Sequence, residues 1–147
     1  MPEATSNSIH RHVFTVSSGD LDENGHVNNV VYVQWMQDVA ILHFDALGGV
    51  EAMQGAGGAW VARSHKIEYL KPAFAGETIL ALTWVANCRR VRSLRRYRFL
   101  READGATLAE GETDWVFVDV ASGRPRSIPD EITRLLPLGQ SEIEKPA

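Results

Sequence analysis

The sequence predicts an α+β domain in which a curled, mainly antiparallel sheet of about five strands wraps around one long central helix. Two observations support this fold class. Residues 30–47 are apolar on nearly every side, which is typical of a buried helix. Four strand-like runs then follow with no helix between them. A single sheet can bury such a helix only by curling around it.

Chain length and composition agree with one soluble domain. The 147 residues suit a single domain, and the 44% hydrophobic and 23% charged contents are ordinary for a globular protein. We therefore expect one domain over 1–147, with disordered tails at 1–8 and 138–147. The net charge of −4 argues against a nucleic-acid partner.

The predicted location is the cytoplasm. The N-terminal residues show no basic region followed by an apolar run, so no secretory signal is expected. No apolar stretch is long enough to cross a membrane, and we expect no membrane partner. The single cysteine, Cys88, excludes an intramolecular disulfide and suits a reducing compartment.

The first half of the chain predicts a strand, the long helix and a loop. His10–Val16 is short, β-branched and aromatic, which favours a strand. Asn28 or Asn29 can cap the start of the helix, and Gly48 can end it. Residues 49–59 are rich in glycine and predict a mobile loop.

The second half predicts the sheet and a short helix. Turn-forming residues separate the strand-like runs 60–70, 78–88, 94–102 and 107–120. Near the C-terminus, Ser127 is a candidate N-cap and Pro129 suits a first helical turn. A short amphipathic C-terminal helix is therefore expected.

The segment just before the long helix contains the most distinctive chemistry. Asp22, Asn24 and His26 alternate along the chain immediately before the predicted helix start. The unpaired amides of a helix N-terminus carry partial positive charge and can stabilise a developing oxyanion. A carboxylate, an amide and an imidazole beside such amides indicate acyl chemistry.

Three segments give the chain a family resemblance. They are SGDLDENGHVNNVVYVQWMQDVA, IEYLKPAFAGE and GRPRSIPDEI. With these motifs the sequence resembles the hotdog-fold acyl-CoA thioesterases, in particular the 4-hydroxybenzoyl-CoA thioesterase group, over roughly residues 10–136. The resemblance implies a hotdog fold and a homodimer or homotetramer with active sites at subunit interfaces. The edge strands of a wrapped sheet are compatible with such pairing.

The resemblance also implies roles for individual residues. Asp22 matches the loop acid that acts as nucleophile or general base in one branch of the family. The backbone amide of Asn29 matches the oxyanion-binding amide, and the motif's Asn and His fall on Asn24 and His26. Another branch uses a glutamate within the helix, which this helix lacks. The loop-acid mechanism therefore fits better.

Each of these residues also has a purely structural interpretation. Aspartate is common in turns before helices, so Asp22 can simply shape the loop. His26 can act as a base, donate a hydrogen bond to substrate or orient its neighbours. Asn24 can orient the attacking water or brace the loop, and Asn28 suits a helix cap.

Seven arginines lie between Arg89 and Arg101. Their structural interpretation is a solvated strand face near a hairpin. However, arginine binds phosphate through a planar fork of donors, and coenzyme A carries a 3′-phosphate and a diphosphate. We therefore predict that some of Arg89, Arg90, Arg92 and Arg95 contact these phosphates.

Other chemistries have little support in the sequence. No G-x-S-x-G motif is present, and Cys88 lacks a motif that would activate it. His10 and His12 can share a strand face, but two histidines are a weak metal signal. We expect no metal and no cofactor other than the coenzyme A of the substrate.

The function expected from the sequence is hydrolysis of an acyl-CoA thioester to a free acid and coenzyme A. A hotdog-type enoyl-CoA hydratase or dehydratase is a rival, but its motif has one more residue between Asn and His than the stretch from Asn24 to His26. A non-catalytic acyl-CoA-binding module is a second rival. The sequence does not predict the acyl group, because pocket depth depends on side-chain packing.

Overall fold

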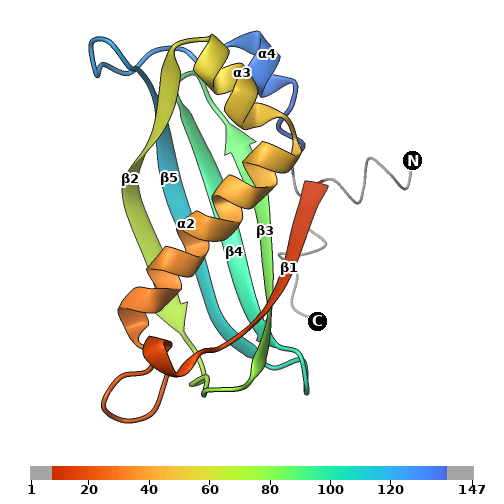
Figure 1. Ribbon diagram of the computed structural model, residues 1–147. Coiled ribbons are helices and arrows are strands. Elements are labelled where there is room, and N and C mark those ends of the chain that lie inside the picture. Colours follow the sequence, from red (N-terminus) through yellow and green to blue (C-terminus); the bar gives the residue numbers. More distant parts are fainter. Residues whose placement is uncertain (1–7, 139–147) are drawn as a thin grey trace.

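The structure is a computed structural model that describes residues 8–138 (Figure 1). One five-stranded sheet contains every strand of this part of the chain, in the order β1-β3-β4-β5-β2 with all neighbours antiparallel. The strands are β1 (Ile9–Thr15), β2 (Gly58–Tyr69), β3 (Thr78–Cys88), β4 (Arg92–Arg101) and β5 (Thr107–Asp119). The predicted strands are confirmed, with ends that differ by at most two residues.

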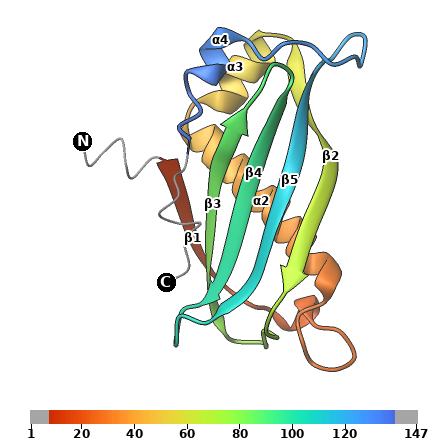
Figure 2. The ribbon, with the colours of Figure 1, turned by 180° about the vertical axis from the view of Figure 1, so that it is seen from behind.

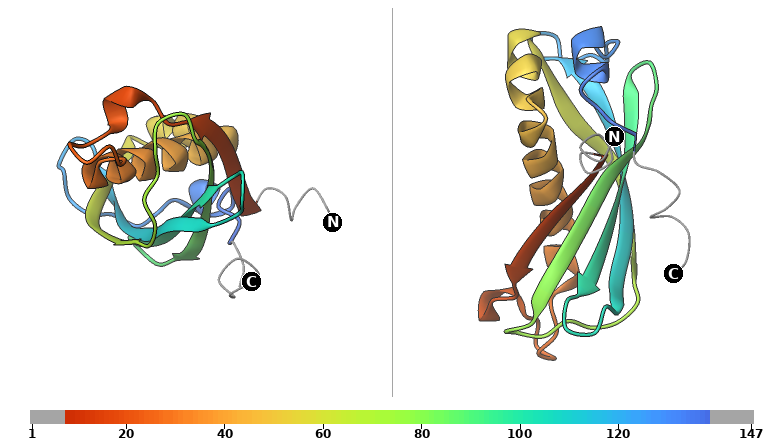
Figure 3. Two further views of the ribbon diagram at one scale, coloured as in Figure 1. Left: turned by 90° about the horizontal axis from the view of Figure 1, so that it is seen from below. Right: turned by 90° about the vertical axis from the view of Figure 1, so that its right-hand side faces the viewer.

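The long helix α2 (Asn29–Ala46) lies against the inner face of the sheet. The side view of Figure 3 shows the helix layer beside the sheet layer, and the end view shows the sheet curling partly around the helix. Inward-facing residues of α2, β4 and β5, among them Met36, Val39, Phe99 and Leu108, are almost completely buried and form the main core. The predicted α+β fold with one wrapped helix is confirmed.

The ends of α2 follow the predicted capping chemistry. The Asn28 side chain accepts a hydrogen bond from the Val30 amide at 3.0 Å, so Asn28 is the N-cap. After the helix, Gly48 has a φ of 83°, a left-handed conformation that glycine adopts without steric cost.

The outer side of α2 is more apolar than that of an ordinary surface helix. Val30, Ile41 and Leu42 are 73%, 57% and 43% exposed. The expectation that the helix is buried on nearly every side is therefore wrong for the chain on its own. The sheet covers one side of the helix, and nothing in the described residues covers the other.

Two local predictions need correction. Residues 49–55, expected within a mobile loop, form the helix α3 (Gly49–Gly55), which packs its apolar side chains against Phe44 and Trp60. The last helix, α4 (Asp130–Thr133), begins after Pro129 rather than Ser127, so Pro129 is its N-cap. In both places the burial of a few apolar side chains determines the local structure. For α3, the glycine-rich composition of 49–59 suggested a loop instead.

One glycine lets α2 approach the sheet closely. Gly111 lies in β5 directly beneath the helix, and a Cβ atom there would be 3.1 Å from the Met36 sulfur and 3.0 Å from the Lys66 carbonyl oxygen. Such distances are shorter than ordinary van der Waals contact. A side chain at position 111 would therefore push against both the helix and β2.

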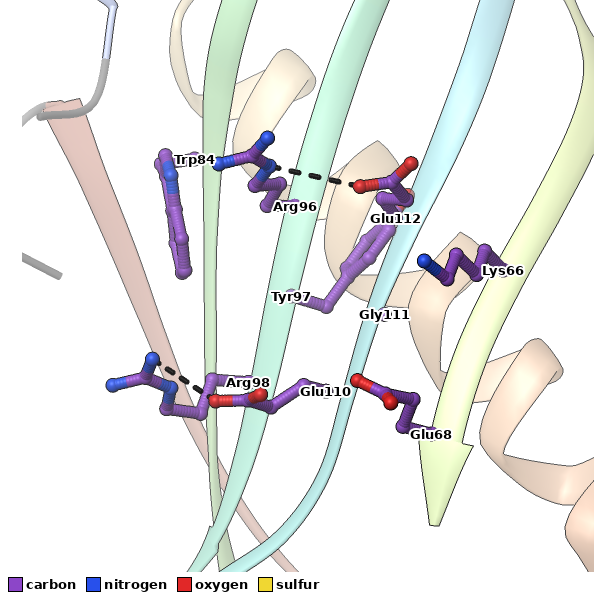
Figure 4. Close-up of a pocket in the computed structure, with 9 residues that line it drawn as sticks. All are labelled: Lys66, Glu68, Trp84, Arg96, Tyr97, Arg98, Glu110, Gly111 and Glu112. Atoms are coloured by element: carbon purple, nitrogen blue, oxygen red, sulfur yellow. Dashed lines mark ion pairs between the residues drawn. The ribbon is translucent and has the colours of Figure 1, made fainter. Parts of the chain in front are cut away.

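The outer face of the sheet is turned toward the viewer in Figure 2. It carries a row of charged side chains, here called the charged ladder, across β2, β4 and β5. Arg98 pairs with Glu110 at 3.0 Å, and Arg96 lies 3.7 Å from Glu112 (Figure 4). Lys66 and Glu68 on β2 extend the same row. Opposite charges therefore face one another across the strands, and the charged side chains of this face pair with each other.

The predicted tails lie outside the described residues except for Ser8, which is buried, and Leu138, which forms a single bridge with Val85. Among the helices of residues 8–138, none is long and apolar enough to span a membrane.

Candidate active site

A cleft of about 230 Å³ lies at the end of the molecule where α2 begins. Its walls come from the loop before α2, from the first turn of α2 and from the segment that follows β2. The lining residues are Asp22, His26, Val27, Asn29, Tyr32, Tyr69, Leu70, Lys71 and Pro72. The structure thus brings three of the predicted site residues, Asp22, His26 and Asn29, to one cleft.

A tight turn fixes the carboxylate of Asp22. Its Oδ1 atom accepts hydrogen bonds from the amides of Asn24 at 2.9 Å and His26 at 3.1 Å. The Asp22 amide donates to the His26 carbonyl at 2.7 Å, and Gly25 supplies the left-handed conformation the turn needs. Oδ2 makes no hydrogen bond to a described residue. Asp22 therefore shapes the loop with one oxygen while the other is available to a ligand in the cleft.

The first turn of α2 leaves one amide unpaired, at a residue that lines the same cleft. The Val30 and Val31 amides are satisfied by the side chain and the carbonyl of Asn28, at 3.0 and 2.9 Å. The Asn29 amide makes no hydrogen bond within the described residues. An unpaired N–H at a helix N-terminus is a suitable donor to an anionic oxygen.

The remaining two motif residues lie differently. The His26 ring is partly buried and packs edge-on against Phe74, with centroids 5.1 Å apart. Asn24 is exposed and lines a neighbouring open hollow, together with Leu21, Glu23 and Asn28; Asp22 lines both this hollow and the cleft. In this structure Asn24 contributes its backbone amide to the turn, and its side chain is not among those lining the cleft.

Two tyrosines of the cleft were not predicted as site residues. The Tyr69 hydroxyl donates a hydrogen bond to the Asn29 carbonyl at 2.8 Å. The Tyr32 hydroxyl is buried without a partner among the described residues, and its burial, together with nearby Tyr69, raises its pKa to about 12. Tyr69 and Lys71 belong to the segment IEYLKPAFAGE, so the sequence contained a signal for them.

The predicted phosphate-binding arginines lie at the opposite end of the molecule. Arg89 and Arg90 are exposed in the turn between β3 and β4, and Arg92 at the start of β4 forms an ion pair with Asp114. Figure 1 shows this turn beside α4, at the far end of α2 from the Asp22 loop. Within one subunit the structure does not bring these arginines to Asp22.

Arg95 is separated from the other three. It points inward from β4, is 4% exposed, and its Nη1 lies 2.9 Å from His43 Nδ1 and 3.1 Å from Thr83 Oγ1. Burial lowers its pKa to about 10. Within residues 8–138, no group of three His, Cys, Asp or Glu side chains is placed to hold a metal ion.

Comparison with known proteins gives one family-level match. The sequence model of the thioesterase-like superfamily matches residues 16–136, which include the loop, α2, all strands except β1, and α4. No protein of curated function matches the sequence significantly.

Three solved structures illustrate the similarity. PA2801 from Pseudomonas aeruginosa, a candidate thioesterase, is 28% identical, with a TM-score of 0.76 over 85% of this chain and 95% of that one. Slr0204 from Synechocystis, a 1,4-dihydroxy-2-naphthoyl-CoA thioesterase, is 15% identical, with a TM-score of 0.79 over 94% and 99%. SAV2348 from Staphylococcus aureus, solved in complex with CoA, is 16% identical, with a TM-score of 0.80 over 86% and 80%. The predicted hotdog fold is confirmed.

Proposed function

The chain belongs to the thioesterase-like superfamily, and we propose that it hydrolyses an acyl-CoA thioester to a free acid and coenzyme A. One observation carries the proposal: Asp22 and the unpartnered amide of Asn29 line the same cleft. A carboxylate and an oxyanion donor around one small space are the two groups that acyl transfer needs. The CoA bound by SAV2348, a protein of the same fold, supports coenzyme A as the carrier.

In the proposed mechanism the thioester carbonyl lies at the N-terminus of α2. The Asn29 amide donates to the carbonyl oxygen and stabilises the negative charge that develops there. Asp22 acts through Oδ2, because Oδ1 is engaged by the two loop amides. The hydrogen bond from Tyr69 to the Asn29 carbonyl holds the next peptide of the chain in place.

Two routes are open to Asp22. As a general base it removes a proton from water, which attacks the carbonyl carbon, and the C–S bond breaks to release coenzyme A. As a nucleophile it attacks the carbonyl carbon itself, releases the thiolate and forms a mixed anhydride that water then hydrolyses. His26 lies beside Asp22 in the cleft and would orient the water or the thioester in either route.

The test of the proposal compares two neighbouring carboxylates. Asp22→Asn keeps an oxygen that can accept both loop hydrogen bonds, so the fold should persist while the charge is lost. We expect its kcat for thiol release, measured across aryl- and alkyl-CoA thioesters, to fall by about 10²- to 10⁴-fold. Glu23→Gln is the matched control, because Glu23 is exposed and does not line the cleft. It should change kcat by less than about threefold, under 1 kcal/mol.

The opposite result would overturn the assignment. An Asp22→Asn protein that folds normally and retains kcat within about tenfold of the unmodified protein, 1.4 kcal/mol, cannot have lost its catalytic group. Acid-quenched reactions would then separate the two routes. Mass spectrometry of the quenched protein shows an acyl adduct on Asp22 only in the nucleophilic route.

We further propose a homodimer in which one subunit's arginines serve its partner's cleft. Strand β2 is an open edge that pairs only with β5 in the described chain. Two copies of β2 paired antiparallel about a two-fold axis place the Gly58 end of one subunit at the Tyr69 end of the other. The end that carries Arg89, Arg90 and Arg92 then meets the partner's Asp22 cleft. Association of two such dimers would give the homotetramer that the resemblance also allows.

The proposed site of action is the cytoplasm. Cys88 is a free thiol in the structure, and burial raises its pKa, so it is less reactive than an exposed thiol. A chain whose single cysteine cannot form an intramolecular disulfide suits that compartment.

A further inference from the structure

A second cavity, of about 330 Å³, lies beneath the C-terminal half of α2. Its walls come from α2, α3 and the inner face of the sheet and are almost entirely apolar, with Phe44, Met53 and Trp60 among them. Ala40 and Ile41 of α2 also line it, about 17 Å along the helix from Asn29 at 1.5 Å per residue. Within one subunit the cavity is therefore separate from the Asp22 cleft.

The cavity contains one buried cation with no anionic partner. Arg95 lines it, is 4% exposed, and forms no ion pair with a carboxylate of the described residues. Its Nη1 contacts His43 Nδ1 and Thr83 Oγ1, neither of which belongs to a carboxylate. Nε and Nη2 make no hydrogen bond to a described residue. A guanidinium removed from water without an anion is costly, so a ligand that brings a negative charge here gains an unusually favourable contact.

Arg95 is the only charged residue among those that line the cavity, and the other lining residues are apolar except Ser93. The cavity thus combines apolar walls with one buried cation.

We propose that this cavity binds the apolar body of a carboxylic acid of moderate size, with the carboxylate at Arg95. Carboxylate oxygens match the fork of guanidinium donors. The acid can be a free molecule or the far end of an acyl group. In the second case the inference rests on the proposed function, and antiparallel β2 pairing would bring the cavity of one subunit, through Ala59 and Trp60, toward the partner's Asp22 cleft.

Binding is tested without catalysis on the Asp22→Asn protein. Trp60 and Trp115 line the cavity, so their fluorescence reports occupancy. Octanoate is compared with octanol, which has the same apolar body and no charge. We expect octanoate to bind at least about tenfold more tightly, because the difference measures the contact with Arg95. Arg95→Met should abolish the difference, and Arg95→Lys should retain part of it.

A second pair of variants provides an independent test if the Arg95 variants do not fold. Ile41 is at the rim of the cavity and 57% exposed, so Ile41→Trp fills the cavity without disturbing the core. Leu42→Trp is the matched control, because Leu42 is 43% exposed and does not line the cavity. Octanoate binding should be lost in the first variant and unchanged in the second.

Turnover distinguishes the two sources of the acid. If the carboxylate is the end of the acyl group, suberyl-CoA should exceed octanoyl-CoA in kcat/KM by at least about tenfold, and Arg95→Met should remove this preference. If the acid is a free molecule, the two thioesters react alike and octanoate still binds. If octanoate binds but the unmodified protein hydrolyses no thioester, the proposed function is refuted and the cavity assignment stands. Equal affinities for octanoate and octanol, or octanoate binding unaffected by Ile41→Trp, would refute the cavity assignment.

Discussion

The hydroxyl of Tyr69, at the end of β2, donates a hydrogen bond to the backbone carbonyl of Asn29, at the start of α2, over 2.8 Å. This contact ties the edge strand of the sheet to the peptide next to the proposed oxyanion donor. It joins residues 40 positions apart in the sequence. The start of α2 is therefore held by β2 as well as by its own cap at Asn28.

Removing this hydrogen bond should weaken the start of the helix. Tyr69→Phe deletes only the hydroxyl, and a typical intramolecular hydrogen bond contributes about 0.5–1.5 kcal/mol to stability. We expect a loss at the lower end of that range, because Tyr69 is 41% exposed. Urea unfolding measures the stability, and a parallel fall in kcat would show that the contact also positions Asn29. No change in either quantity would contradict the prediction.

Tyr32→Phe is the matched comparison, and its expected effect on stability has the opposite sign. The Tyr32 hydroxyl is buried without a described partner, so its removal relieves a desolvation cost. Stability should stay constant or rise by up to about 1 kcal/mol. If kcat nevertheless falls, the hydroxyl contacts substrate in the cleft. A clear loss of stability would mean that the hydroxyl has a partner in the folded protein.

Acid should destabilise the protein partly through His65. Its ring lies 2.8 Å from Thr113 Oγ1, and burial lowers its pKa below 6.5. Between that lowered pKa and 6.5 the unfolded chain binds the proton and the folded protein does not. The free energy of unfolding therefore decreases as the pH drops from 6.5 toward the lowered pKa. His10, whose pKa is lowered mainly by burial, acts in the same direction.

The check is the pH dependence of unfolding in a variant that cannot titrate. His65→Gln can still hydrogen-bond Thr113, and its free energy of unfolding should decrease less than that of the unmodified protein between pH 7 and pH 5. If urea unfolding gives the same decrease in the free energy of unfolding for both proteins between pH 7 and pH 5, His65 takes no part.

The charged ladder on the outer face should contribute little to stability. Arg98 and Glu110 are 3.0 Å apart, but their side chains are 20% and 39% exposed to solvent. Such pairs typically contribute about 0.2–1 kcal/mol. A double-mutant cycle with Arg98→Ala and Glu110→Ala should give a coupling in this range that shrinks in 1 M salt, where the Debye length is about 3 Å. A larger coupling that salt does not affect would contradict this interpretation.

Mixed dimers test whether subunits share sites. A subunit with Asp22→Asn is paired with one carrying Arg89→Ala, Arg90→Ala and Arg92→Ala. If arginines serve the partner's cleft, one of the two sites is complete, and the mixed dimer should recover about half of the activity.

The control places all four changes on one subunit and pairs it with an unmodified one. If the sites are shared, both clefts of this control dimer are defective and its activity is low. If each subunit has a self-contained site, the cleft of the unmodified subunit is intact. Thiol-release assays on dimers purified through two different tags therefore give opposite orders of activity for the two models. A control dimer more active than the test dimer would exclude sharing.

Local patterns in the sequence predicted most of the fold. The alternation of the strand runs, the apolar segment of α2 and the signals at Asn28 and Gly48 are properties of neighbouring residues, and the structure confirms them. The helix α3 was missed because its apolar side chains pack in a cluster with Phe117, Ile128 and Ile132, which are distant in sequence and near in space. The composition of a local segment does not show such packing.

The site was only partly predictable, for the same physical reason. Asp22, His26 and Asn29 are close in sequence, so their shared cleft follows from the turn that joins them. Tyr69 reaches this cleft only because the sheet curls, and Arg95 is buried because inward and outward positions alternate along β4. Whether an arginine in a basic run faces solvent or the core depends on strand register, which a charge count does not reveal.

The missing side chain at Gly111 constrains how this protein can evolve. The Lys66 carbonyl and the end of Met36 both lie closer to a Cβ atom at 111 than ordinary contact allows, so any side chain there must displace both of them. A shorter residue at 36 relieves only the contact with the helix, at the cost of a cavity. Homologues that carry a side chain at 111 should therefore combine a smaller residue at 36 with a shifted β2, and sequence covariation between α2 and β5 would reflect the spacing between helix and sheet.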